Sequence, residues 1–107
     1  MGAMLNIVHD DRTPDEDVAM LAGGLQQIVI DALGDKDVFV YISKPFRAIG
    51  NDPIEVFIQV NSHKVPDAAG LVENLSATLR DWKQQNSFAH PVNLNINPVE
   101  WFSEIGV

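Results

Sequence analysis

The sequence contains no cysteine, and this absence excludes disulfide bonds and any chemistry that needs a thiolate. Basic residues are also scarce: seven Lys and Arg stand against fifteen Asp and Glu, which gives a formal net charge of −8. Nucleic acid and anionic membrane surfaces both attract clustered bases, so we expect neither as a partner. No apolar run approaches the roughly 20 residues that a membrane-spanning helix needs, and we recognise no signal peptide. A cytoplasmic protein is therefore the default expectation.

Signatures of bound cofactors and metals are missing as well. Gly23 and Gly24 fall inside an expected helix rather than at its start, so they do not make a phosphate-binding loop. His9, Asp10 and Asp11 are metal-ligand types, but adjacent residues rarely converge on one ion because successive side chains point apart. We expect no cofactor and no metal. A small anionic ligand is compatible with the acidic chain if a few bases converge locally.

Apolar residues alternate with a period of two in four stretches, which is typical of strands with one face in a core. The clearest is residues 54–60, where every even position is Ile or Val. These β-branched side chains suit a pleated, half-buried surface. Further strands are predicted at residues 4–9, 37–43 and 92–97. In the strand at 37–43, the side chains expected to face the core are Val38, Val40 and Ile42.

Two other segments show the spacing of three and four that is typical of amphipathic helices. The first helix is predicted to be capped by Thr13 together with Glu16 and to end at Gly34. The second is predicted to start at Pro66, because proline suits the first helical position. The apolar stripes are Val18, Leu21, Leu25, Ile28 and Ala32 in the first helix, and Ala68, Leu71, Leu75, Leu79 and Trp82 in the second.

The order of elements is β-α-β followed by β-α-β again. Each unit normally makes a right-handed crossover between parallel strands. The predicted fold class is therefore α+β with two layers, a four-stranded mixed sheet with both helices on one face. We expect one domain over residues 1–107, with residues 1–3 a candidate expression remnant ahead of a natural Met4. A ferredoxin-like module that senses small molecules shares this element order, but it would place another strand between the first two.

The sheet face opposite the helices is predicted to carry a mixture of aromatic and amide side chains. Two interpretations stay open: an ordinary exposed sheet face, or a subunit interface with packed aromatics and trapped water. The residues concerned are Asn6, Phe39, Tyr41, Glu55, Phe57, Gln59, Asn93, Asn95 and Asn97.

The chain resembles the tautomerase superfamily, the fold of macrophage migration inhibitory factor and 5-carboxymethyl-2-hydroxymuconate isomerase. The resemblance rests on the alternating first strand, on residues 38–43 with the turn at 48–53, and on residues 92–96 with Trp101 shortly after. It implies a homotrimer with three sheets around a central channel and active sites near the subunit boundaries. It also implies proton transfer next to a carbonyl on a small carboxylate-bearing substrate. The residues we expect at the interface are Phe39, Tyr41, Phe57, Trp101 and Phe102.

The base that the resemblance implies is a proline at the amino terminus, and this sequence does not have it. Ala3 stands at the matching position; if Met4 is the natural start, Leu5 comes second. The first proline of the chain is Pro14, at a helix start. Proline-dependent catalysis is therefore unsupported, and a member of the same fold that binds a ligand or a protein without catalysis is the alternative.

Candidate residues for a substrate pocket each have a plainer interpretation. Lys36 matches the region of a pocket lysine, or it is a solvated lysine beside a helix C-terminus. Asn95 matches an asparagine on the last strand of the family that the chain resembles, or it binds water on a sheet face. Lys44 and Arg47 are close enough for a carboxylate to bridge them, or they solubilise a loop. Arg80 and Lys83 share that spacing and are expected on a solvated helix face. The pocket candidates are thus Ala3, Met4, Lys36, Lys44, Arg47 and Asn95.

Overall fold

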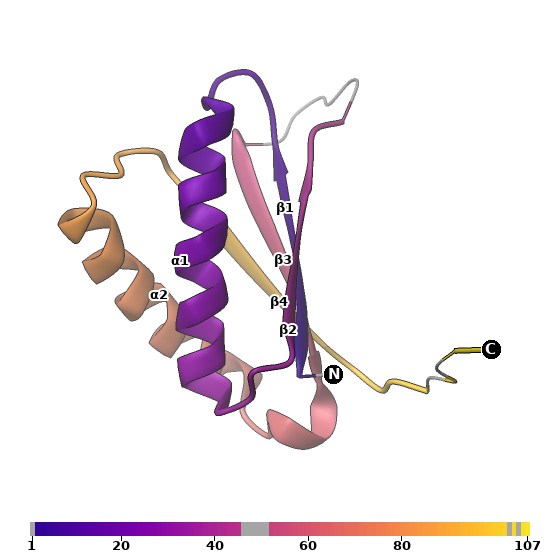
Figure 1. Ribbon diagram of the computed structural model, residues 1–107. Coiled ribbons are helices and arrows are strands. Elements are labelled where there is room, and N and C mark those ends of the chain that lie inside the picture. The colour runs from indigo at the N-terminus through magenta and orange to yellow at the C-terminus, as the bar shows by residue number, and fades with distance from the viewer. Residues whose placement is uncertain (1, 46–51, 103, 105) are drawn as a thin grey trace.

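The computed structural model describes residues 2–45, 52–102, 104, 106 and 107 (Figure 1). It confirms the predicted order of strands and helices, with ends that differ by one or two residues. The elements are β1 (Ala3–His9), α1 (Asp15–Leu33), β2 (Val38–Ser43), β3 (Ile54–Asn61), a 3-10 helix η1 (Ser62–Lys64), α2 (Ala68–Gln85) and β4 (Asn93–Val99).

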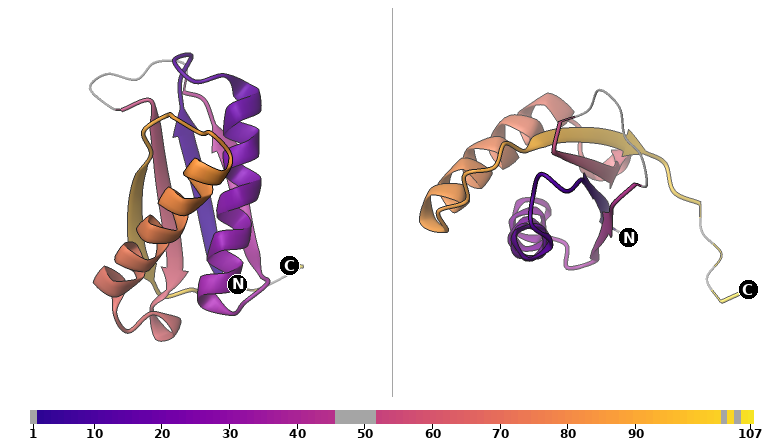
Figure 2. Two further views of the ribbon diagram at one scale, coloured as in Figure 1. Left: turned by 90° about the vertical axis from the view of Figure 1, so that its left-hand side faces the viewer. Right: turned by 90° about the horizontal axis from the view of Figure 1, so that it is seen from above.

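The four strands form one mixed sheet in the order β2-β1-β3-β4. β1 pairs with β2 in parallel, β3 pairs with β4 in parallel, and β1 and β3 meet antiparallel at the centre. Two β-α-β units are therefore joined side by side, and both helices cover the same face (Figures 1 and 2). Because β1 and β2 are neighbours, the ferredoxin-like arrangement is excluded.

The core lies between the sheet and the two helices. On β3 the alternation predicted from the sequence is confirmed, since every even position from 54 to 60 is fully buried. Fully burying an aliphatic side chain contributes about 1.5–3 kcal/mol, so this strand is a main source of stability. The other well-buried apolar residues of the strands and helices are Ala3, Leu5, Ile7, Val18, Leu21, Leu25, Ile28, Val29, Val38, Leu75 and Leu79.

Two residues predicted for the core are exposed. Ile42 is 47% exposed, because β2 is an edge strand with a neighbour on one side only. Ala32 is exposed in the last turn of α1, where Leu33 packs against the core in its place. Val29, which the predicted stripe omitted, is buried instead.

The predicted helix starts are wrong in detail, whereas the predicted end of α1 is confirmed. Pro14 occupies the cap position of α1 and no side chain caps that helix, so the hydroxyl of Thr13 is buried without a hydrogen-bond partner in the described part of the chain. Helix α2 begins at Ala68 because the Asp67 carboxylate accepts a hydrogen bond from the amide of Gly70 at 3.0 Å. Gly34 ends α1 in the left-handed conformation with φ 66°.

The two glycines inside α1 have different surroundings, and we expect opposite effects from replacing them. A Cβ on Gly24 would overlap the indole ring of Trp82 on α2, whereas a Cβ on Gly23 would meet nothing within 4 Å. Gly23→Ala should therefore raise the free energy of unfolding by up to about 1 kcal/mol through helix propensity. Gly24→Ala gains the same propensity but overpacks the α1–α2 contact at a cost of about 1–3 kcal/mol. Urea titration of both variants measures the difference.

The control for the glycine pair is a variant that also shortens the side chain on α2. Gly24→Ala combined with Trp82→Leu should recover part of the stability that Gly24→Ala loses, because the overlap is removed. Equal stabilisation by the two single substitutions would show that the helices do not need the close approach at Gly24.

Candidate functional site

The start of β1 is the position at which the sequence resemblance places a catalytic amine. The amides of Gly2 and Ala3 donate to the carbonyl oxygen of Asp37 at 2.9 and 3.3 Å, and Ala3 is fully buried. Because Gly2 precedes it, the nitrogen of Ala3 belongs to a planar amide whose lone pair is delocalised. This atom has no basicity to offer a substrate.

Three of the predicted pocket residues, Ala3, Met4 and Lys36, belong to this end of the sheet, but their side chains do not converge. Lys36 lies in the loop that joins α1 to β2, next to Asp37, and is exposed. Met4 follows Ala3 but faces the other side of the sheet, in register with Phe39 and Gln59. Figure 1 shows the amino terminus beside this loop. The backbone of Lys36 is thus close to Ala3 through the bonds to its neighbour Asp37, whereas the side chain of Met4 belongs to the open face of the sheet.

Lys44 lies at the opposite end of the sheet from Lys36. It follows the end of β2, whose six residues span roughly 20 Å. Its Nζ lies 2.6 Å from the Asp11 carboxylate and 3.5 Å from that of Asp15. The hydrogen bond to Asp11 raises the pKa of Lys44, and the charge of Asp15 adds to the effect. The predicted partner Arg47 and most of the predicted turn at 48–53 lie outside the described residues.

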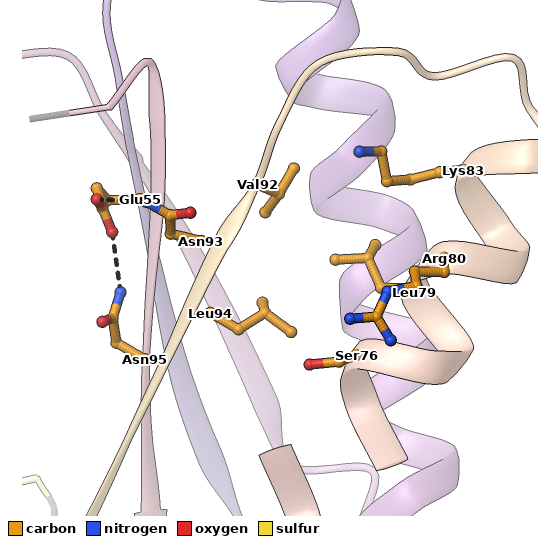
Figure 3. A pocket seen from close by; sticks show the side chains of 9 residues that line it. All are labelled: Glu55, Ser76, Leu79, Arg80, Lys83, Val92, Asn93, Leu94 and Asn95. Atoms are coloured by element: carbon orange, nitrogen blue, oxygen red, sulfur yellow. Dashed lines mark hydrogen bonds between the residues drawn. The ribbon is translucent and has the colours of Figure 1, made fainter. Parts of the chain in front are cut away.

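Asn95 is held by groups of its own sheet. It lies on β4 in register with Phe57, and its side-chain amide donates to Glu55 at 3.0 Å and to the carbonyl oxygen of Val56 at 3.2 Å (Figure 3). Ala3 pairs with Val60 instead and faces the helices. A single subunit therefore does not bring Asn95 and Ala3 to one substrate.

The sheet face away from the helices is an aromatic patch framed by amides. Phe39, Tyr41 and Phe57 are 45%, 57% and 46% exposed. One cross-strand row contains Tyr41, Asn6, Phe57 and Asn95, and the next contains Phe39, Met4, Gln59 and Asn97. The Ser43 hydroxyl donates to the Asn6 side chain at 2.9 Å, which satisfies one of the central amides. The structure thus confirms that aromatic and amide side chains share this face, and both interpretations, an exposed sheet face and a subunit interface, stay open at this point.

The segment after β4 leaves the body of the subunit (Figures 1 and 2). Phe102 is 90% exposed, and Trp101 is half-buried. An aromatic side chain on an extended segment gains little free energy unless another surface covers it. The residues predicted for an interface therefore lie in two places. Trp101 and Phe102 lie on this segment, and the other three lie on the aromatic face.

A cavity of about 480 Å³ between α2 and β4 was not predicted from the sequence. Arg80 and Lys83, which we expected on a solvated helix face, line it together with the start of β4. The spacing of Arg80 and Lys83 along α2 could have indicated this cavity. That inference also requires knowing that residues 92–94 lie opposite these two bases. The lining side chains are drawn in Figure 3: Glu55, Ser76, Leu79, Arg80, Lys83, Val92, Asn93, Leu94 and Asn95.

Within the described residues, no three His, Asp or Glu side chains gather closely enough to hold a metal ion. None of the helices in the described part of the chain is long and apolar enough to cross a membrane.

The fold of the chain is similar to that of solved proteins with the tautomerase fold. A fused 4-OT, described as an asymmetric trimer, is similar over 97% of this chain and 94% of its own, with a TM-score of 0.66 and 17% identity. Malonate semialdehyde decarboxylase is similar over 97% and 92% of the two chains (TM-score 0.64, 14% identity). A macrophage migration inhibitory factor-like protein from Entamoeba histolytica is similar over 95% of each chain (TM-score 0.63, 14% identity). No protein-family model and no curated protein matches the sequence. The likeness therefore establishes the tautomerase fold.

Proposed function

We propose that the chain forms a homotrimer with the tautomerase fold, holds a small carboxylate-bearing compound near the start of β1, and performs no proline-dependent proton transfer as its sequence stands. This proposal rests on the state of Ala3 in the structure. The residue is buried, and its nitrogen is a peptide amide that donates a hydrogen bond to the carbonyl oxygen of Asp37. Lys36, which is exposed in the loop next to Asp37, would supply the positive charge for a carboxylate. Proton transfer next to a carbonyl would need an unprotonated amine at this position.

Ketonisation of phenylenolpyruvate by the unmodified chain tests the catalytic half of the proposal. The substrate carries a carboxylate, and its conversion requires a proton transfer next to a carbonyl. We expect a rate indistinguishable from that of buffer at neutral pH. Robust turnover would contradict the proposal, because it would show that a base other than the strand-start nitrogen is at work.

The trimer is proposed from the aromatic face and supported by the description of the fused 4-OT as a trimer. Three copies packed with these faces inward would cover Phe39, Tyr41 and Phe57, whose exposure in one subunit is otherwise costly. The tail with Trp101 and Phe102 would then lie at a boundary with a neighbouring copy.

Static light scattering at micromolar concentration should report a mass three times the 11.8 kDa of the chain. The same mass is expected at moderate and high salt, because apolar contacts rather than surface ion pairs hold the assembly. A mass of 11.8 kDa would leave the aromatic patch as an exposed sheet face and remove the trimer from the proposal.

A further inference from the structure

Three polar side chains of α2 point toward β4 from one face of the helix. Ser76, Arg80 and Lys83 are spaced by four and three residues, which places them on the same side of an α-helix. Figure 3 shows the Ser76 hydroxyl, the Arg80 guanidinium and the Lys83 ammonium directed toward the gap in front of β4. Leu79, between them, is 4% exposed and fixes the helix face against the core.

The opposite wall of this gap is apolar and held in place. Val92 and Leu94 are partly buried and line the cavity from the side of β4. The loop that leads to them is anchored by Phe88, which is 5% exposed, and by a 2.9 Å contact between His90 and the Asp17 carboxylate on α1. The cavity of about 480 Å³ is within the usual range for a small-molecule site.

The charge of the gap is opposite to that of the chain as a whole. Among the described residues no acid forms an ion pair with Arg80 or Lys83, whereas Arg12 and Lys44 are both paired with aspartates. The one carboxylate that lines the cavity is Glu55, which accepts hydrogen bonds from Asn93 at 2.9 Å and Asn95 at 3.0 Å on the other side of β4 (Figure 3). Two cations with no acidic partner among the described residues, in a chain of net charge −8, make a local anion-attracting site.

Lys83 has a further contact that limits where its ammonium lies. The Nζ atom lies 6.0 Å from the centroid of the Phe88 ring, at the outer limit of a cation–π contact. A second hollow, which Phe88 also lines, shares Arg80 and Lys83 with the first. The two bases therefore line both hollows.

We propose that the cavity between α2 and β4 binds a small organic carboxylate with an apolar body. The carboxylate would accept charge-assisted hydrogen bonds from Arg80 and Lys83 and a further one from Ser76. The apolar body would lie on Val92 and Leu94. An apolar wall beside the two bases favours an organic anion over inorganic phosphate, which has nothing to place there.

This site is separate from the one proposed at the start of β1. β4 begins beside Glu55, which pairs with Val8 near the end of β1, whereas Ala3 pairs with Val60. The two sites are therefore at opposite ends of the sheet. A variant that loses binding at one site should keep binding at the other, so the two proposals can fail separately.

Titration of the full chain with phenylacetate, followed by amide chemical shifts, tests the proposal. Saturable shifts are expected in residues 76–83 and 92–94. Arg80→Gln with Lys83→Gln should weaken phenylacetate binding at least tenfold while resonances remote from α2 stay in place, which shows that the fold is kept. Arg12→Gln is the matched control, since it removes one exposed base that is paired with Asp10 and belongs to neither proposed site, and it should leave the affinity for phenylacetate at this site unchanged.

Two further probes identify the ligand chemistry. Phenylacetamide has the same apolar body without the charge, and it should bind at least tenfold more weakly than phenylacetate. Inorganic phosphate should also bind more weakly, because it has no apolar body for Val92 and Leu94. Unchanged affinity in the double variant, equal binding of phenylacetamide, or tighter binding of phosphate would each overturn the proposal.

Discussion

A proline placed directly before Met4 as the first residue of the chain should create measurable ketonisation of phenylenolpyruvate where the unmodified chain has almost none. The unmodified strand start offers a peptide nitrogen bonded to Asp37, which cannot accept a proton. A terminal proline would place a secondary amine there, beside an apolar core that disfavours its charged form and lowers its pKa. Displacing a catalytic group by about 1 Å costs on the order of 100-fold in rate, and supplying a correctly placed base should gain at least that much.

The matched control keeps the same chain length but begins with Ala3. It has a primary α-amine whose unperturbed pKa is about 7.7–8.0, so much of it is protonated at neutral pH. We expect activity between that of the unmodified chain and the proline variant. A second variant with proline in place of Met4 tests the alternative alignment. If neither proline variant gains activity while the trimer is intact, the chain is a binding member of the fold rather than a catalyst that lacks its base.

The fold could be predicted because its signals are local. The alternation over residues 54–60 fixes which side of β3 is buried, and all four even positions are buried in the structure. The repeated β-α-β order limits the sheet to a few topologies, since crossovers are right-handed. The errors at Ala32 and Ile42 have another origin. Burial there depends on where a helix ends over the sheet and on which strand lies at the edge, and neither is encoded in a residue's immediate neighbours.

The candidate site was harder to predict because its contacts join distant parts of the chain. The ion pair between Lys44 and Asp11 forms only because β1 and β2 lie side by side. The sequence alone therefore suggested a free base in a loop where the structure has a paired one. Asn95 is bonded to Glu55 by the register of β3 and β4. The cavity at Arg80 and Lys83 likewise requires α2 to lie across β4. Parallel pairing does, however, place Lys36 and Lys44 at opposite ends of the sheet, which the topology alone could have shown.

Phe57→Asp should convert the proposed trimer into monomers at micromolar concentration. Phe57 is central in the aromatic face, between Asn6 on β1 and Asn95 on β4. Its side chain is 46% exposed in one subunit, so an aspartate there meets water and the fold is kept. In a trimer with these faces inward, the same carboxylate would be buried without a counter-charge, near Glu55 on the same strand face. Burying an uncompensated charge costs about 3–5 kcal/mol, and each trimer would contain three of them.

Met20→Asp is the matched control for this substitution. Met20 has nearly the same exposure, 41%, but lies on α1 in the layer of helices on the other side of the sheet. Light scattering should therefore give the trimer mass for Met20→Asp and the monomer mass for Phe57→Asp, while circular dichroism shows both to be folded. Since both changes add one negative charge to a chain that already has a net charge of −8, general repulsion would affect them alike. A trimer that survives Phe57→Asp would place the subunit contact away from the aromatic face, and monomers in both variants would attribute dissociation to net charge.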